Sequence, residues 1–129
     1  MAAAPFIFIG THAIKPGKLE RFKEVAAQLA EGVDTHEPQM ILFNFYLNED
    51  ETEATIVQVH PNADSMVVHM QTMREFIKIG TDELLDSKQI QIFGEPNDAV
   101  LGMVKMLSQE EAELSFKPKI GPGVSRLQL

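Results

Sequence analysis

The stretch IVQVHPNADSMVVHM, residues 56–70, decides the fold because it joins a strand to a helix at one fixed point. Its first five residues are rich in β-branched side chains, which is typical of a buried strand that ends at His60. Pro61 has no backbone N–H to donate to a sheet, so the strand stops there. Asn62 or Asp64 can then accept a hydrogen bond from a free N–H and begin a helix.

The helix that follows carries one apolar stripe. Its members recur at i, i+4, i+7 and i+11, which is the spacing of one helix face. They are Met66, Met70, Met73 and Ile77. We expect Gly80 to loosen or end this helix.

The rest of the chain supplies the partners of this strand and helix. The sequence predicts a buried strand at 6–14, a helix at 18–32 with Gly32 as its stop, and a strand at 40–47. The acidic segment 48–53 is expected to be a hairpin loop, and KQIQIF, residues 88–93, a fourth strand. The order β-α-β-β-α-β indicates an α+β fold of the ferredoxin-like class, with a four-stranded antiparallel sheet.

Residues 1–95 are expected to form this ferredoxin-like domain, and residues 96–129 a C-terminal extension. Asn97 is expected to cap a short amphipathic helix, whose apolar members are Val100, Leu101, Val104 and Leu107. The segment 114–120 has extended character, but Pro118 limits it to the edge of a sheet. The tail VSRLQL, residues 124–129, is expected to pack on the same domain or on a partner subunit.

Composition excludes several classes of function. The 129 residues carry a formal net charge of −8, which disfavours nucleic acid and anionic membrane surfaces as partners. There is no cysteine, so thiolate catalysis and thiolate metal sites are excluded. The start of the chain lacks a basic secretion signal, and no apolar run is long enough to span a membrane. We therefore expect a cytoplasmic protein of one domain.

The element order resembles a known family. The turn KPGK, residues 15–18, leads into ERF, and the hairpin is followed by PNADSMVVHM, residues 61–70. Over roughly residues 6–95 this resembles the antibiotic biosynthesis monooxygenases, which belong to the dimeric α+β barrel superfamily. The resemblance implies two helices on one sheet face and a homodimer formed through the other. The apolar strand MILFNFYL, residues 40–47, agrees with a sheet that is covered on both faces.

The resemblance also implies a chemistry. Members of the family oxidise anthrones or hydroquinones with O2 and need no bound metal or flavin, so we expect no cofactor. The family often has a tryptophan where this chain has His60, and an acidic residue where it has Gln58. Some relatives degrade heme, but their asparagine and iron-binding histidine would fall near Gly10 and Ile79, and the chain has no tryptophan. Heme degradation is therefore not expected.

His69 and His60 are the candidate catalytic residues. Histidine is the side chain best suited to accept a proton near neutral pH, and a strand-end histidine and a histidine in the next helix can face one cleft. His12 shares a strand face with Phe6, Phe8 and Gly10 and is a candidate for the same cleft. Packing in the core with one hydrogen bond is the alternative for each of these histidines. His36 is expected to be solvated.

Further residues are candidates for substrate binding. Asn44 and Tyr46 lie two apart on one strand and therefore share a face, where they can orient a substrate and steady an oxyanion, and Gln58 lies in register with His60. Asn44 can equally form a polar bridge in a dimer interface. The methionines of the helix stripe, Met66, Met70 and Met73, suit the core or the wall of an aromatic-ligand pocket. The scattered histidines lack the spacing of a metal site, so no metal is expected.

Two functions fit these residues best, and isomerase or lyase chemistry on the same fold stays open as a third. The first is a cofactor-independent monooxygenase that oxidises a small aromatic or quinol-like molecule with O2. The second is a non-catalytic dimer of the same fold that binds a small hydrophobic ligand or acts as an interaction module. The fold does not decide between them.

Overall fold

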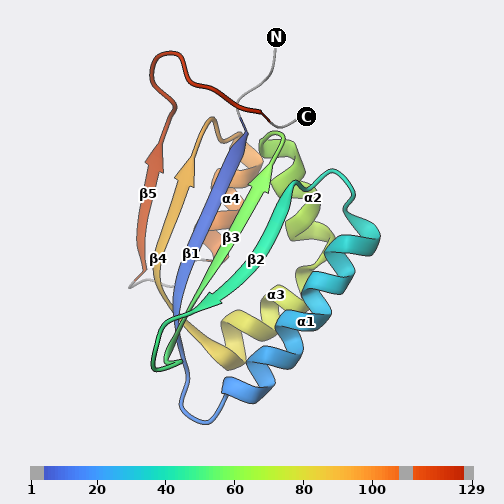
Figure 1. Ribbon diagram of the computed structural model, residues 1–129, viewed down its shortest axis with the longest axis vertical. Helices are drawn as coiled ribbons and strands as arrows, with labels where there is room; N and C mark the ends of the chain where they lie inside the picture. Colours follow the sequence, from blue (N-terminus) through green and yellow to red (C-terminus); the bar gives the residue numbers. More distant parts are fainter. Residues whose placement is uncertain (1–4, 108–111, 127–129) are drawn as a thin grey trace.

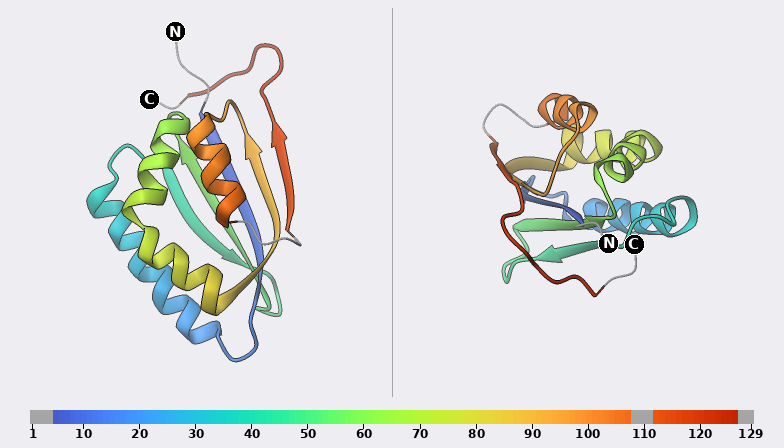
Figure 2. Two further views of the ribbon diagram at one scale, coloured as in Figure 1. Left: turned by 180° about the vertical axis from the view of Figure 1, so that it is seen from behind. Right: turned by 90° about the horizontal axis from the view of Figure 1, so that it is seen from above.

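The computed structural model describes residues 5–107 and 112–126. A five-stranded sheet has the order β2-β3-β1-β4-β5, and the helices lie on one of its faces (Figures 1 and 2). The elements are β1 (Phe6–Ile14), α1 (Leu19–His36), β2 (Leu42–Leu47), β3 (Glu53–His60), α2 (Ala63–Thr72), α3 (Arg74–Ile79), a π-helical turn (Gly80–Leu84), β4 (Leu85–Phe93), α4 (Asp98–Leu107) and β5 (Glu113–Lys117).

The first four strands form the predicted antiparallel sheet, and the βαββαβ order is confirmed. The prediction of four strands is incomplete, because β5 pairs with β4 in parallel and makes the sheet mixed. β5 lies at the edge and ends at Lys117, directly before Pro118. This is the position in a sheet that tolerates proline, because the edge needs no further N–H donor.

Strand register decides which side chains face the helices. In the centre of the sheet Ile9 lies opposite Val57, and both point away from the helix layer, whereas their neighbours in sequence point toward it. A bulge between Thr11 and His12 interrupts the pairing of β1 with β4, so that Thr11 lies opposite Gln89 and His12 lies opposite Ser87. The bulge brings Ser87 to the helix side next to His12.

The first helix is longer than predicted. Gly32 lies inside α1, where a Cβ atom would come within 2.9 Å of the Met73 methyl group, so the glycine permits close packing and does not end the helix. The helix ends at His36 because Glu37 precedes Pro38, and a residue before proline is disfavoured in helical geometry.

The second predicted helix is divided. α2 begins as predicted, with the Asn62 side chain accepting a hydrogen bond from the backbone N–H of Ser65 at 3.0 Å. It ends at Thr72, α3 follows after Met73 at a new angle, and the π-helical turn leads from Gly80 into β4 (Figure 2). β4 starts at Leu85, three residues before its predicted start at Lys88.

The helix of the C-terminal extension, α4, packs on the helix side of the sheet. Asn97 caps α4 as predicted, because its Oδ1 accepts from the Val100 N–H at 2.8 Å. Val100 and Val104 are buried in the same cluster as Phe6 and Ile92. The Leu107 side chain, residues 108–111 and the tail residues 127–129 lie outside the described part of the chain.

Among the helices of the described ranges, none combines the length and the apolar character needed to cross a bilayer.

Candidate functional site

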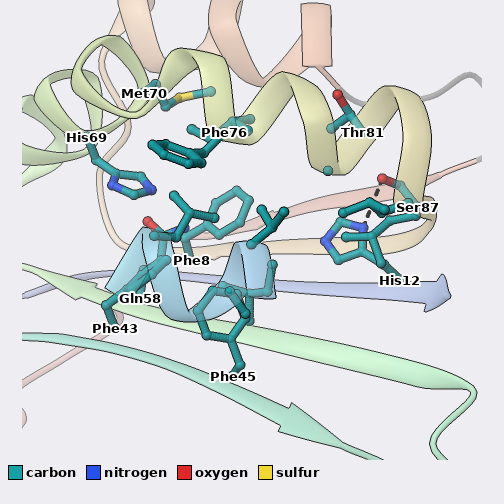
Figure 3. Close-up of a pocket in the computed structure, with 18 of the residues that line it drawn as sticks. Phe8, His12, Phe43, Phe45, Gln58, His69, Met70, Phe76, Thr81 and Ser87 are labelled. Carbon is teal, nitrogen blue, oxygen red and sulfur yellow. Dashed lines mark hydrogen bonds between the residues drawn. The ribbon is translucent and has the colours of Figure 1, made fainter. Parts of the chain in front are cut away.

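A cavity of about 100 Å³ lies between the helix face of the sheet and the helices α1, α2 and α3. Its wall is mostly aromatic and apolar, as Figure 3 shows. The apolar side chains include Phe8, Phe43, Phe45, Phe76, Met66 and Met70. The polar residues of the wall are His12, Gln58, His69, Thr81 and Ser87. An apolar cavity with a few convergent polar groups is the usual form of a small-molecule site.

His69 and Gln58 lie at one end of this cavity, and His12 and Ser87 lie at the other, with phenylalanine rings between them (Figure 3). His69 comes from α2, Gln58 from β3, His12 from β1 and Ser87 from β4. The fold thus gives the cavity two polar ends and an aromatic middle.

His69 forms a buried hydrogen bond with Glu37. The Nδ1 atom of His69 lies 3.0 Å from Oε2 and 3.2 Å from Oε1 of Glu37, and the exposed fractions of the two side chains are 2% and 0%. The Phe43 ring packs against the imidazole at a centroid distance of 5.2 Å. Since the carboxylate accepts the Nδ1–H, Nε2 remains to accept a proton, and it has no hydrogen-bond partner within residues 5–107 and 112–126.

Glu37 was not among the residues singled out from the sequence. It follows the last turn of α1, beyond the predicted helix end at Gly32, and it is 1% exposed. A signal was present: Leu29 and Val33 are buried on α1, and Glu37 continues their spacing of four residues. An acidic residue that extends a buried helix stripe needs a partner, and His69 provides it.

His12 is held by Ser87 at the other end of the cavity. The Nδ1 atom of His12 and the Ser87 Oγ lie 3.0 Å apart. The imidazole leans back along β1 over Gly10, where a Cβ atom would lie 2.8 Å from Nε2. Burial lowers the pKa of His12 to about 4, so the ring is neutral at physiological pH.

His60 does not face the cavity, contrary to the expectation that it acts as a base there. It is 0% exposed and lies behind the wall, with Nδ1 2.6 Å from the Ser65 Oγ and Nε2 2.9 Å from the Gln58 Oε1. Burial, and then the electrostatic interaction with His69, lower the pKa of His60 to about 3. A neutral ring with both nitrogens engaged is not available to take a substrate proton.

Asn44 and Tyr46 do not line the cavity either. Both point to the opposite face of the sheet, Tyr46 is 52% exposed, and the Asn44 Nδ2 donates to the Tyr46 hydroxyl at 3.2 Å. The shared strand face was predicted correctly, but Phe43 and Phe45 occupy the side that faces the helices. Met66 and Met70 line the cavity, whereas Met73 packs against α1 at Gly32. His36 is exposed.

The predicted site residues are therefore brought together in part. His12, Gln58, His69, Met66 and Met70 meet around one cavity. In the part of the chain that the structure describes, no group of three or more histidine, aspartate or glutamate residues is placed to hold a metal ion.

Comparison with known proteins gives structural relatives only. No protein-family model matches the chain, and no curated protein sequence matches it. The crystal structure of MupZ from Pseudomonas fluorescens is similar with a TM-score of 0.71 and 17% identity, over 97% of this chain and 98% of that one.

Two structures named as putative antibiotic biosynthesis monooxygenases are also similar. The protein from Nitrosomonas europaea has a TM-score of 0.57 and 17% identity, covering 65% of this chain and 83% of its own. The protein from Caulobacter crescentus has a TM-score of 0.53 and 17% identity, covering 58% and 74%. The predicted resemblance in fold to this family is confirmed.

Proposed function

We propose that the protein binds a small aromatic or quinol-like molecule in the cavity and oxidises it with O2, with His69 as the general base. The observation that carries this proposal is the imidazole of His69, oriented by the buried Glu37 carboxylate, in the wall of an apolar cavity. A base is most useful where water is excluded, because the anion it creates is then not quenched by solvent.

The reaction starts with a proton transfer. Nε2 of His69 takes a proton from a ring hydroxyl or an activated C–H, and the Glu37 carboxylate stabilises the imidazolium that forms. The resulting anion is rich enough in electrons to reduce O2, which adds to the ring carbon. One oxygen atom stays on the product and the other leaves as water, so that a CH2 group becomes a carbonyl group, or a hydroquinone becomes a hydroxyquinone.

The cavity limits the size of the substrate. Its volume of about 100 Å³ is below the ~150 Å³ of an apolar cavity that holds benzene. We therefore expect one ring to fit with small adjustments of the wall. A substrate with three fused rings requires α3 and the following π-helical turn to move away from the sheet.

We propose that the protein is a homodimer. The helices cover one face of the sheet (Figure 2). The other face has Ile9 and Val57 at its centre. A second copy of the chain covers such a face in the manner implied by the family resemblance. Asn44 and Tyr46 lie on this face, which favours a role in the interface for these two residues.

Oxygen consumption by the purified protein tests the proposal. The substrate panel contains substituted hydroquinones and anthrones, and a chelator is present throughout. His69→Ala is expected to lower the uptake by about 10²–10⁴-fold, as for removal of a general base. His36→Ala is the matched control, because His36 is exposed in the last turn of α1.

Each outcome has a defined meaning. Uptake that survives the chelator, persists in His36→Ala and is lost in His69→Ala supports the proposal. A folded protein without uptake on any compound of the panel contradicts the oxygenase and favours a ligand-binding protein of the same fold.

A further inference from the structure

We propose that His60 is a positioning residue that fixes the Gln58 carboxamide, so that its N–H groups point into the cavity and bind a ligand oxygen that carries negative charge. This inference rests on the proposed function, because it names the group that stabilises the anion formed when His69 removes a proton. It also gives His60 a role other than that of a base.

The hydrogen bonds around His60 determine its tautomer. A neutral imidazole has one N–H, and the Gln58 Oε1 at 2.9 Å from Nε2 can only accept. Nε2 therefore carries the hydrogen, and Nδ1 accepts from the Ser65 hydroxyl at 2.6 Å. Ser65 itself is held at the start of α2, where its N–H donates to the Asn62 Oδ1.

The same bonds determine the orientation of Gln58. With its Oε1 turned to His60, the Nε2 of Gln58 is the end of the carboxamide left for the cavity that the residue lines. Gln58 is 5% exposed, and within residues 5–107 and 112–126 its carboxamide makes one side-chain hydrogen bond, through Oε1 to His60. An amide N–H that faces the apolar cavity gains a hydrogen bond when a ligand oxygen is placed beside it.

The position of this donor fits the proposed proton transfer. The rings of His60 and His69 are 6.1 Å apart, so the carboxamide bonded to His60 lies at the same end of the cavity as the base (Figure 3). Removal of a proton from a phenol or a ring ketone leaves the charge on oxygen. A fixed N–H beside that oxygen stabilises the anion more than the neutral molecule, which is the property of an oxyanion donor.

The neutral state of His60 keeps the arrangement constant. Because burial and the neighbouring His69 lower its pKa to about 3, the ring does not change its protonation in the working range of pH. The direction in which Gln58 points is thus independent of the protonation of the base. The ligand class that follows is an aromatic molecule with a ring-conjugated oxygen, bound more tightly as its anion.

Binding of two matched probes tests the inference without turnover. The probes are 4-nitrophenol, studied as its anion, and nitrobenzene, which has the same ring and no hydroxyl group. Gln58→Leu is expected to weaken binding of 4-nitrophenolate by about tenfold, the usual loss for a hydrogen bond to a charged group, and to leave nitrobenzene within about twofold.

Two substitutions of His60 separate positioning from packing. In His60→Gln the side-chain amide replaces the Nε2–H donor, whereas His60→Met has similar length and no donor. We expect His60→Met to reproduce the loss seen in Gln58→Leu and His60→Gln to retain most of the discrimination. Circular dichroism of each variant establishes that the fold is intact.

The inference is overturned if the wild-type protein does not prefer the anion over nitrobenzene, or if Gln58→Leu keeps that preference. It is also overturned if His60→Met and His60→Gln behave alike. A protein that discriminates as expected but consumes no O2 refutes the proposed oxygenation and retains the inference about Gln58.

Discussion

The Nδ1 atom of His69 on α2 lies 3.0 Å from the Oε2 atom of Glu37, the residue that follows α1, and both side chains are withdrawn from solvent. The bond joins two helices through residues 32 positions apart in the chain. A carboxylate on Nδ1 fixes the tautomer of an imidazole and leaves Nε2 as the proton acceptor. The proposed activity and the packing of α2 against the end of α1 therefore depend on the same contact.

Replacement of Glu37 by glutamine tests this dependence. The amide keeps the size of the side chain but can donate to Nδ1, which leaves the hydrogen on Nε2 and removes the base. We expect Glu37→Gln to lower oxygen uptake at least 10²-fold, by the reasoning that applies to the aspartate of a catalytic triad. The initial rate of O2 consumption measures the effect.

The control for Glu37→Gln is Glu31→Gln, on the exposed side of α1. Equal activity of the two variants would show that the carboxylate of Glu37 serves only to hold α1 and α2 together. In that case thermal unfolding, and not turnover, would distinguish them, because the hydrogen bond to the buried carboxylate contributes about 1.5–3 kcal/mol to the free energy of unfolding.

Gly10 is expected to be intolerant of a side chain. A Cβ atom would lie 2.8 Å from Nε2 of His12 and 3.3 Å from the Phe8 ring, so Gly10→Ala must displace the imidazole toward the cavity or away from Ser87. We expect a loss of about 1–3 kcal/mol in the free energy of unfolding, as for overpacking in a core.

A double-mutant cycle identifies the cause of the Gly10→Ala effect. If the clash with His12 is responsible, Gly10→Ala costs much less in a His12→Ala background, and the two changes are not additive. Chemical denaturation of the four proteins gives the coupling energy. Simple additivity would assign the loss to Phe8 or to the backbone of β1.

Stability is expected to fall as the pH is lowered below 6.5. His12 has a pKa of about 4 in the folded protein and the ordinary value of 6.5 when unfolded, so between these values the unfolded chain binds a proton that the folded chain does not. The contribution of His12 to the free energy of unfolding is complete above pH 6.5 and is lost as the pH falls toward 4. For His60 the window extends to about pH 3.

His12→Gln measures how much His12 contributes to the pH dependence of the unfolding free energy. The pH slope of the unfolding free energy is expected to decrease by on the order of 1 kcal/mol per pH unit inside the window, because one pKa unit corresponds to ~1.4 kcal/mol. The comparison is made at one protein concentration, with His36→Gln as the exposed control. An unchanged slope in His12→Gln would mean that this ring takes up its proton without unfolding.

The fold was largely predictable from the sequence, whereas the site was predictable only in part. Strand alternation placed His12 on the helix side of β1, and Pro61 with the Asn62 cap fixed where β3 ends and α2 begins. These are local rules of backbone geometry. The sequence pattern also grouped Asn44 with Tyr46 correctly.

What failed was the placement of Asn44 and Tyr46 in the cavity, whereas His12 and Gln58 line it as predicted. In β2 the face of Phe43 and Phe45 is apolar and the face of Asn44 and Tyr46 is partly polar, so the alternation did carry a signal that the two phenylalanines face the helices. Glu37 was missed because Gly32 was interpreted as the end of α1, although that glycine makes room for Met73. The hydrogen bond between His60 and Ser65 was not predicted, because it depends on how the start of α2 packs against the end of β3.

The uncovered face of the sheet leads to the last prediction, which concerns the oligomeric state. Light scattering at micromolar concentration is expected to give twice the 14.4 kDa mass of one chain. Val57→Lys places a charge at the centre of the face, opposite Ile9, and is expected to produce a monomer, because burying an unpaired charge in an interface is strongly unfavourable. Val68→Lys is the control, since Val68 on α2 is 42% exposed on the helix side.

The cavity residues of one chain are sufficient to form the cavity and the bond between His69 and Glu37. We therefore expect the Val57→Lys monomer to bind 4-nitrophenol with an affinity within a few-fold of the wild-type value, whereas Val68→Lys remains a dimer. A wild-type protein with the mass of one chain, or a Val57→Lys variant that stays dimeric, contradicts an interface on this face. Loss of ligand binding together with the dimer would instead show that the second chain keeps the strands of the cavity wall in place.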